Sequence, residues 1–198
     1  MIDISKINKS EPYSLIQELY EKALEKKQRN IEALLIASFD KDLNEVDSRF
    51  VNLKFIDDIN FIFFSNYESP KSKQFNSHNQ ISAILYWSAI DAQIRMKANI
   101  SKCSKHFSDE YFKNRSPDKN ALAISSSQSQ KIESYEKIKE KYISIKNNAD
   151  LKHRPSYWGG FTFIPYVIEI WEGNSYRLNK RRMYEKKDGL WKKNFLEP

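Results

Sequence analysis

The segment from Pro155 to Arg182, PSYWGGFTFIPYVIEIWEGNSYRLNKRR, constrains the fold more than any other part of the chain. Under the two-residue alternation of a strand, its apolar side chains divide between two faces. One face carries Phe161, Phe163, Pro165, Val167, Glu169 and Trp171, and the other carries Thr162, Ile164, Tyr166, Ile168 and Ile170. Because both faces are mostly apolar, we expect a strand inside a barrel or at a subunit interface.

A turn pair, Gly173-Asn174, follows this strand and predicts a β-hairpin. The second arm would begin with Ser175 to Asn179 and carry Arg177 and Arg181, while the first arm ends near Trp171. A flat aromatic surface and fixed guanidinium groups would then lie close together. Such an arrangement is suited to a planar anionic ligand.

Composition limits the class of protein and its partners. The 198 residues fit one domain, or one domain with a helical attachment, and the net charge of +7 favours anions without identifying them. No basic recognition helix stands out, so we expect no nucleic-acid partner. A single cysteine, Cys103, excludes an intramolecular disulfide, and the three histidines have no metal-ligand spacing. Without a signal sequence or a long apolar run, we expect a soluble, cytoplasmic protein with no membrane partner.

The first half of the chain predicts an amphipathic helix followed by an antiparallel meander. Apolar residues at helical spacing cover Ser14 to Gln28, with Ser10 or Ser14 as a cap. Alternating or fully apolar runs with short connections then predict strands over Ile31–Asp40, Ser48–Ile56 and Asn60–Asn66.

A short helix over Ser69 to Asn79 follows, because a serine cap precedes a proline at the first helical position. Lys71 and Lys73 lie beside the free N–H groups of its first turn, which predicts a phosphate-binding corner. Two further strands are predicted over Gln80–Trp87 and Asp91–Ile100.

Residues 104–148 form a charged, helical insertion. One helix is expected to open at Ser108 and to end or bend at Pro117. A second covers Ser134 to Ile145, and its apolar residues are spaced for burial: Tyr135, Ile138, Tyr142 and Ile145. The last strand covers Leu190–Leu196 after the turn Lys187-Asp188-Gly189. The fold class is therefore mainly β with added helices (α+β), with an N-terminal helical segment at 1–30 and a barrel domain at 31–198.

Several stretches, in their order, resemble the pyridoxine/pyridoxamine 5′-phosphate oxidase family. They are RFVNLK at 49–54, FFSN at 63–66, YFKNR at 111–115, SQSQ at 127–130, SYWGGF at 156–161, and IEIWEGNSYRL with its continuation to Arg181. The similarity extends from about residue 31 to the C-terminus. It implies an antiparallel FMN-binding split β-barrel, a homodimer, and FMN held in clefts between two subunits.

The resemblance also implies roles for individual residues. The flavin contacts would be Arg49, Phe50, Val51, Asn52, Leu53, Lys54, Phe64, Ser65, Lys71, Gln93, Gln128, Ser129, Trp171 and Arg181. The substrate site would comprise Lys54, Tyr111, Arg115, Lys119, Arg177 and Asn179, with Arg177 against the substrate ring in the catalytic role. Taken alone, Trp171 is typical of a core aromatic and Arg115 of a surface cation. It is the ordered resemblance that favours function for both.

Three positions depart from the family pattern. Asn179 replaces a histidine, Lys119 replaces a serine of the substrate-phosphate pocket, and Pro70 replaces an arginine before the phosphate-binding Lys71. Lys119 can hold phosphate as a point charge, whereas Asn179 carries no charge at neutral pH. Strict alternation also places Arg49 and Lys54 on opposite faces of their strand, so the strand must bulge or the cleft must be reached from both sides.

The leading hypothesis is an FMN-dependent oxidase that converts a phosphorylated B6 vitamer, pyridoxamine or pyridoxine 5′-phosphate, to pyridoxal 5′-phosphate with O2 as the electron acceptor. An alternative, favoured by Asn179, is a related flavin oxidase that acts on another ring, as in phenazine pathways. A third hypothesis, motivated by Pro70 and Asn179, is a protein that binds FMN or pyridoxal phosphate without turnover.

Overall fold

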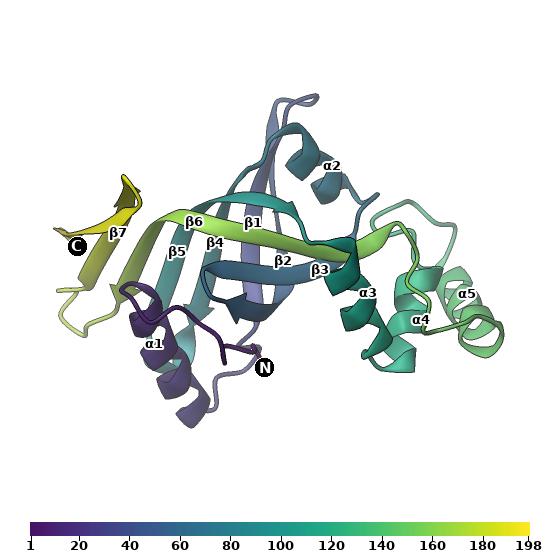
Figure 1. Cartoon of the computed structure of the whole chain (residues 1–198), viewed down its shortest axis with the longest axis horizontal. Helices are drawn as coiled ribbons and strands as arrows, with labels where there is room; N and C mark the ends of the chain where they lie inside the picture. The colour runs from purple at the N-terminus through teal and green to yellow at the C-terminus, as the bar shows by residue number, and fades with distance from the viewer.

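A closed antiparallel barrel of six strands forms the body of the molecule in a computed structural model that describes all residues 1–198. The strands are β1 (Ala33–Asp40), β2 (Glu45–Asp57), β3 (Asn60–Asn66), β4 (Gln80–Trp87), β5 (Ala92–Lys102) and β6 (Trp158–Glu172). Their order is β3-β2-β1-β4-β5-β6, and pairing of β3 with β6 closes the barrel. β7 (Lys180–Lys187) and β8 (Leu190–Leu196) continue the sheet beyond β6, as Figure 1 shows for β7. The predicted fold class is confirmed.

The long strand β6 lies inside the barrel, as its two apolar faces predicted. Strict alternation along it is wrong, however, because the pairing with β5 shifts between Pro165 and Val167 and leaves Tyr166 as an extra residue. As a result, Phe161 and Phe163 before the bulge and Ile168 and Ile170 after it all point into the same core, and each is almost fully buried. One bulge therefore exchanges the two faces of the strand halfway along.

The paired glycines at the start of β6 admit two neighbouring side chains. A Cβ at Gly159 would lie 2.1 Å from the Tyr67 hydroxyl oxygen, and one at Gly160 would lie 2.8 Å from the Cys103 sulfur. Neither position leaves room for a larger residue while those neighbours stay in place. The glycines thus allow the residues that directly follow β3 and β5 to pack tightly against β6.

The N-terminal helix α1 (Tyr13–Glu25) packs against the barrel, and its buried apolar side chains belong to the same core as the strands. Neither Ser10 nor Ser14 caps the helix with its side chain, in contrast to the prediction, because the N-cap position is Pro12. Main-chain bonds to the Ser10 carbonyl satisfy the first turn instead.

The remaining helices gather at one end of the barrel (Figure 1). α2 (Pro70–Ser77) begins as predicted at Ser69 with proline in its first turn. α3 (Lys105–Lys113) begins earlier than predicted, because the Ser104 hydroxyl accepts a hydrogen bond from the Phe107 N–H and caps it. Pro117 begins α4 (Pro117–Ser125) and does not end a helix, since a proline in the first turn has no N–H to lose.

The helix α5 (Tyr135–Asn148) confirms a helix in this region but not the predicted burial. None of its residues is buried, and the Tyr135 side chain is 65% exposed. The helix packs mainly against α4 and lies far from the barrel, so its apolar spacing has no core to face (Figure 1).

The predicted hairpin at the C-terminal end forms, but its turn is longer than expected. β6 ends at Glu172 and β7 begins at Lys180, so Arg177 lies in the connecting loop and not on the second arm. Arg177 is exposed and has a φ of 61°, a conformation that few residues other than glycine adopt. No helix in the structure is both long and apolar enough to span a bilayer.

Candidate functional site

A cavity of about 730 Å³ opens where β2, the end of β3, α2, α3 and α4 meet. Its volume falls within the range of roughly 300–1,000 Å³ that small-molecule sites occupy. The lining residues are Arg49, Phe50, Val51, Asn52, Lys54, Phe64, Ser65, Lys71, Tyr111, Asn114, Arg115, Ser116, Lys119, Gln128, Ser129 and Trp158. Five of these carry a positive charge and none carries a carboxylate. The cavity is therefore suited to an anionic ligand.

Three hydrogen-bond donors converge in one corner of the cavity on the side-chain oxygen of Gln128. Lys71 Nζ donates to Gln128 Oε1 over 3.0 Å, Ser65 Oγ over 2.9 Å and the Asn66 N–H over 3.3 Å. A cation, a hydroxyl and a backbone amide aimed at one oxygen are the groups that hold a phosphate oxygen. The predicted phosphate-binding corner at Lys71 thus has a suitable donor set, whereas Lys73 is exposed and lies outside the cavity.

Lys71 is held as a buried cation. Lys71 is only 6% exposed. Burial and the positive charge of Arg49 together lower the pKa of the Lys71 ammonium group to about 8. Arg49 is itself fixed by Ser38 Oγ at 2.6 Å, by Gln74 Oε1 at 2.9 Å and by the Asp47 carboxylate. A bound anion would relieve the cost of both buried charges.

A second group of cations, Lys54, Arg115 and Lys119, lines the same cavity. Burial lowers the pKa of Lys54; Glu32 opposes this shift, and Lys119 and Arg115 add to it. Burial likewise lowers the pKa of Arg115. Three cations that repel one another within reach of one cavity again favour a ligand with concentrated negative charge.

Stacked aromatic rings form one wall of the cavity. Phe64 and Tyr111 lie face to face with ring centroids 3.6 Å apart, and Trp158 stacks in parallel 5.3 Å from Phe64. The Arg115 guanidinium lies over the Trp158 ring at 4.5 Å. The cavity thus presents planar, apolar surface beside its cations.

The strand β2 contributes residues from both of its faces. Arg49 and Val51 line the cavity from one face, and Phe50 and Asn52 line it from the other, so the cavity extends around the strand. Leu53 was predicted as a flavin contact, but its side chain is fully buried in the core.

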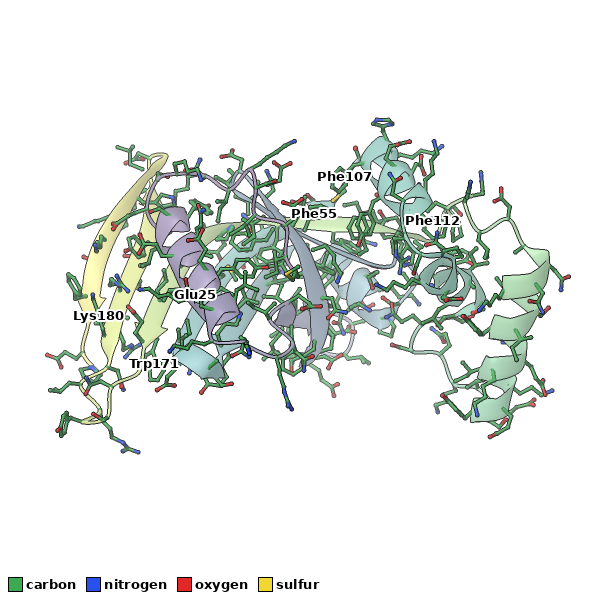
Figure 2. All side chains as sticks on the ribbon, turned by 90° about the horizontal axis from the view of Figure 1, so that it is seen from below. Glu25, Phe55, Phe107, Phe112, Trp171 and Lys180 are labelled. Carbon is green, nitrogen blue, oxygen red and sulfur yellow. The ribbon has the colours of Figure 1, made fainter.

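Five other predicted site residues lie together at the opposite end of the molecule: Gln93, Trp171, Arg177, Asn179 and Arg181. Figure 2 shows Trp171 at the end that also carries Lys180, away from Phe55, Phe107 and Phe112. Trp171, Arg177 and Asn179 share a separate cavity of about 560 Å³.

The remaining two of these five pair with Trp171 in the sheet: Gln93 is its partner across β5 and β6, and Arg181 its partner across β6 and β7. Arg181 donates to Glu169 Oε1 from Nε at 2.9 Å. The predicted residues thus form two groups, and one copy of the chain does not bring them together.

Sequence reasoning missed several residues of the cavity. Trp158 was quoted only as part of the WGGF stretch, and Asn114 and Ser116 flank the predicted Arg115. Asn66, quoted only as part of FFSN, contacts the lining residue Gln128. Asn66 acts through its backbone N–H, which a side-chain pattern does not report. For Trp158, its place between a tyrosine and two glycines was the available signal.

Comparison with known proteins identifies the family. A protein named pyridoxine/pyridoxamine 5′-phosphate oxidase from Aliarcobacter butzleri is 32% identical over 201 residues, covering 100% of this chain and 93% of its own length. One of the same name from Leptospira interrogans is 30% identical over 192 residues, covering 96% and 89%. The chain belongs to the pyridoxine/pyridoxamine 5′-phosphate oxidase family.

Other comparisons agree with membership in this oxidase family. Residues 158–198 match the family model described as the pyridoxine 5′-phosphate oxidase C-terminal dimerisation region. PhzG from Burkholderia lata 383, solved with tetrahydrophenazine-1-carboxylic acid, superimposes with a TM-score of 0.90 at 26% identity and covers 96% of this chain and 93% of its own. A pyridoxamine 5′-phosphate oxidase-related, FMN-binding protein from Nostoc punctiforme shares the fold, with a TM-score of 0.79 at 12% identity over 96% of this chain.

Proposed function

We propose that the protein is an FMN-dependent oxidase that converts pyridoxamine or pyridoxine 5′-phosphate to pyridoxal 5′-phosphate. The observation that carries the proposal is a cavity that holds two groups of cations, Arg49 with Lys71 and Lys54 with Arg115 and Lys119, together with planar aromatic surface. FMN and the B6 vitamers each combine one phosphate with one planar ring. Two phosphates match the two groups of cations, and two rings match the planar surface of the same cavity.

The residues present fit FMN. Its phosphate would take the place of Gln128 Oε1 among the donors of Lys71, Ser65 and Asn66, with Arg49 supplying further charge. Its ring would lie along β2, where Phe50, Val51 and Asn52 line the cavity. When bound, FMN supplies the acceptor for two electrons from the substrate and passes them to O2.

The second group of cations would hold the phosphate of the substrate. Lys54 and Lys119 act as point charges, and the guanidinium of Arg115, supported by the Asn120 Oδ1 at 3.2 Å, can bind two phosphate oxygens at once. Tyr111 would add its hydroxyl, because its ring already lines the cavity. These residues bind and orient the substrate, and the reaction requires no acid or base from them.

A homodimer would complete the site. Gln93, Trp171, Arg177, Asn179 and Arg181 lie too far from the cavity to reach it within one chain, and β6 to β8 are the region that matches a dimerisation model. In a two-fold dimer, each cavity would receive this group of residues from the partner. Arg177 would then lie against the substrate ring, and Asn179 would offer a hydrogen bond.

Anaerobic reduction of the bound flavin tests the proposal. The purified protein, loaded with FMN, should lose its visible flavin absorbance when pyridoxamine or pyridoxine 5′-phosphate is added without O2, and regain it on exposure to air. Pyridoxamine without its phosphate should act far more slowly at the same concentration. A protein that binds no FMN, or whose flavin stays oxidised with both phosphates, contradicts the proposal.

A second candidate function is oxidation of a tricyclic ring. The similarity to PhzG, which was solved with a tetrahydrophenazine carboxylic acid, favours it, as does the uncharged Asn179. A ligand with one carboxylate leaves at least two of the three cations Lys54, Arg115 and Lys119 without an anion. For this reason the phosphate substrate is our primary proposal. The same bleaching assay with a reduced phenazine carboxylic acid separates the two functions.

A further inference from the structure

The strand β2 loses one of its partners at the point where it carries Lys54. β1 pairs with β2 only as far as Asn52, and the pairing with β3 shifts between Leu53 and Phe55, so that Lys54 is the extra residue of a β-bulge. Beyond Asn52, the edge of β2 that β1 leaves open needs another source of hydrogen bonds.

The N-terminal segment of residues 2–8 covers this open edge. The Asp3 N–H donates to the Lys54 carbonyl over 2.8 Å, and the Ile56 N–H donates to the Asp3 carbonyl over 2.9 Å. Further along, the Asp58 N–H donates to the Lys6 carbonyl over 2.8 Å. These main-chain bonds continue the ladder of β2 past its bulge, in the parallel direction.

The segment is itself firmly held. Ile2 and Ile7 are 5% and 2% exposed and belong to the core of the barrel. The Tyr20 hydroxyl of α1 accepts a bond from the Ile2 N–H and donates one to the Ile2 carbonyl, both at 2.9 Å. Asp3 therefore meets the bulge from a position fixed on both sides by packing and hydrogen bonds.

We infer that residues 2–8 are a positioning element for the active site, which fixes the β2 bulge and thereby holds the Lys54 ammonium group in the cavity. Arg115 and Lys119 repel the Lys54 ammonium group, so their charges favour its displacement from the cavity. The backbone of Lys54 cannot rotate away while the Asp3 N–H donates to its carbonyl and the Asp3 carbonyl accepts from the Ile56 N–H. The inference rests on the proposed function for its consequence, which is tighter binding of a phosphorylated substrate.

The substitution Asp3→Pro tests the inference. Proline removes the N–H that donates to the Lys54 carbonyl, and it keeps the carbonyl of residue 3 that accepts from the Ile56 N–H. Asp3→Ala is the matched control, since it keeps both main-chain groups and loses only the side-chain bond to the Ser5 N–H. In the FMN-loaded protein, Asp3→Pro should raise KM for pyridoxamine 5′-phosphate roughly tenfold, the cost of one misplaced charge-assisted contact, with little change in kcat or in flavin content. Asp3→Ala should match the wild type.

A second measurement needs no substrate. In lysine-labelled protein, the Lys54 side-chain NMR signal, assigned by its loss in Lys54→Met, should titrate closer to the ordinary lysine range in Asp3→Pro than in the wild type or in Asp3→Ala. Unchanged Lys54 titration in folded Asp3→Pro overturns the inference. If Asp3→Pro does not fold, Tyr20→Phe replaces it, because this variant removes both hydrogen bonds to the main chain of Ile2. The KM for pyridoxamine 5′-phosphate and the Lys54 titration are then measured in that variant. A wild type that never oxidises pyridoxamine 5′-phosphate refutes the proposed function alone, because the titration still reports on the positioning of Lys54.

Discussion

Arg49 and Lys54 line the same cavity although strict alternation places them on opposite faces of β2. The cavity makes this possible, because it extends around the strand and takes in Phe50 and Asn52 as well as Val51. Alternation holds up to the β2 bulge, so Lys54 stays on the face of Phe50 and Asn52. The strand therefore separates two positive regions of one cavity, the first around Arg49 and Lys71 and the second around Lys54.

Lys71→Met should affect ligand binding and stability in opposite directions. The ammonium group is buried and its pKa is lowered to about 8, so the ligand-free fold bears the cost of a buried charge. Replacing it should raise the free energy of unfolding without ligand by about 1–3 kcal/mol. The FMN affinity should fall at least tenfold, since one charge-assisted hydrogen bond to phosphate is worth about 1.5–3 kcal/mol. Chemical denaturation and flavin fluorescence titration measure the two effects, and Lys73→Met, outside the cavity, is the control.

The affinity for FMN should fall as the pH rises above about 8, where free Lys71 loses its proton. A bound phosphate favours the charged lysine and raises its pKa, so binding takes up a proton in this range and weakens by up to about tenfold per pH unit. Below pH 8 the lysine is already charged, and this dependence disappears. Titrations at several pH values between 7 and 9.5 should show the decline in the wild type and its absence in Lys71→Met. An equal decline in both proteins would assign the effect to another group.

Much of this fold follows from local patterns in the sequence. The strands Asn60–Asn66, Gln80–Trp87 and Leu190–Leu196 have the predicted bounds, because a short run rich in apolar residues is bounded by polar residues in each case. The bulge at Tyr166 and the long loop before Lys180 were not predictable in this way, because they depend on which residues of β5 and β7 pair with β6. The exposure of α5 depends likewise on its distance from the barrel.

The candidate site was predictable only in part. The residue types that suit a planar anion stood out near Trp171 and Arg181, and the resemblance to a family supplied the other positions. No local pattern indicates that Gln128 reaches Lys71, which lies 57 residues away and meets it only because α2 and the loop after α4 adjoin. The separation of the residues into two distant groups is likewise a property of the folded chain.

Gln128→Glu should weaken FMN binding more than the same negative charge introduced at the neighbouring residue 127. In the wild type the amide oxygen accepts bonds from Lys71, Ser65 and the Asn66 N–H, and a phosphate must displace it. A carboxylate in its place would compete as an internal anion and should reduce affinity by about 1.5–3 kcal/mol. Ser127→Glu adds the same charge at an exposed position outside the cavity. Equal affinities for the two variants, measured by flavin fluorescence, would contradict direct competition.

Glu169→Gln should loosen Arg181, which the resemblance assigns to the flavin. The Glu169 side chain is only 12% exposed and pairs with Arg181 at 2.8 Å and with Arg95 at 3.3 Å. Without its charge, the arginines on β5 and β7, which flank β6, repel each other, so we expect a loss of stability of about 1–3 kcal/mol and weaker FMN binding. Glu185→Gln, on a carboxylate with no ion pair, should change neither thermal unfolding nor flavin affinity. Normal flavin affinity in Glu169→Gln would contradict a role for Arg181 in binding FMN.

Mixing two inactive variants tests whether each site combines residues of two subunits. Arg115→Met damages the cavity, and Arg177→Leu damages the distant group. If every cavity receives Arg177 from the partner, a mixed dimer has one site with both defects and one with none. Random association then restores about a quarter of wild-type activity, because half of the dimers are mixed and each has one intact site of two.

The control mixture combines Arg177→Leu with Trp171→Ala, which belong to the same group. Each site of that mixed dimer takes the whole group from one damaged subunit, so activity should stay at the level of the separate variants. If both groups served the same chain's own site, neither mixture would recover, because every subunit would carry its own defect. Recovery in the first mixture and not in the second therefore requires a site built across the dimer, and it explains why a single chain keeps Arg115 and Arg177 at opposite ends.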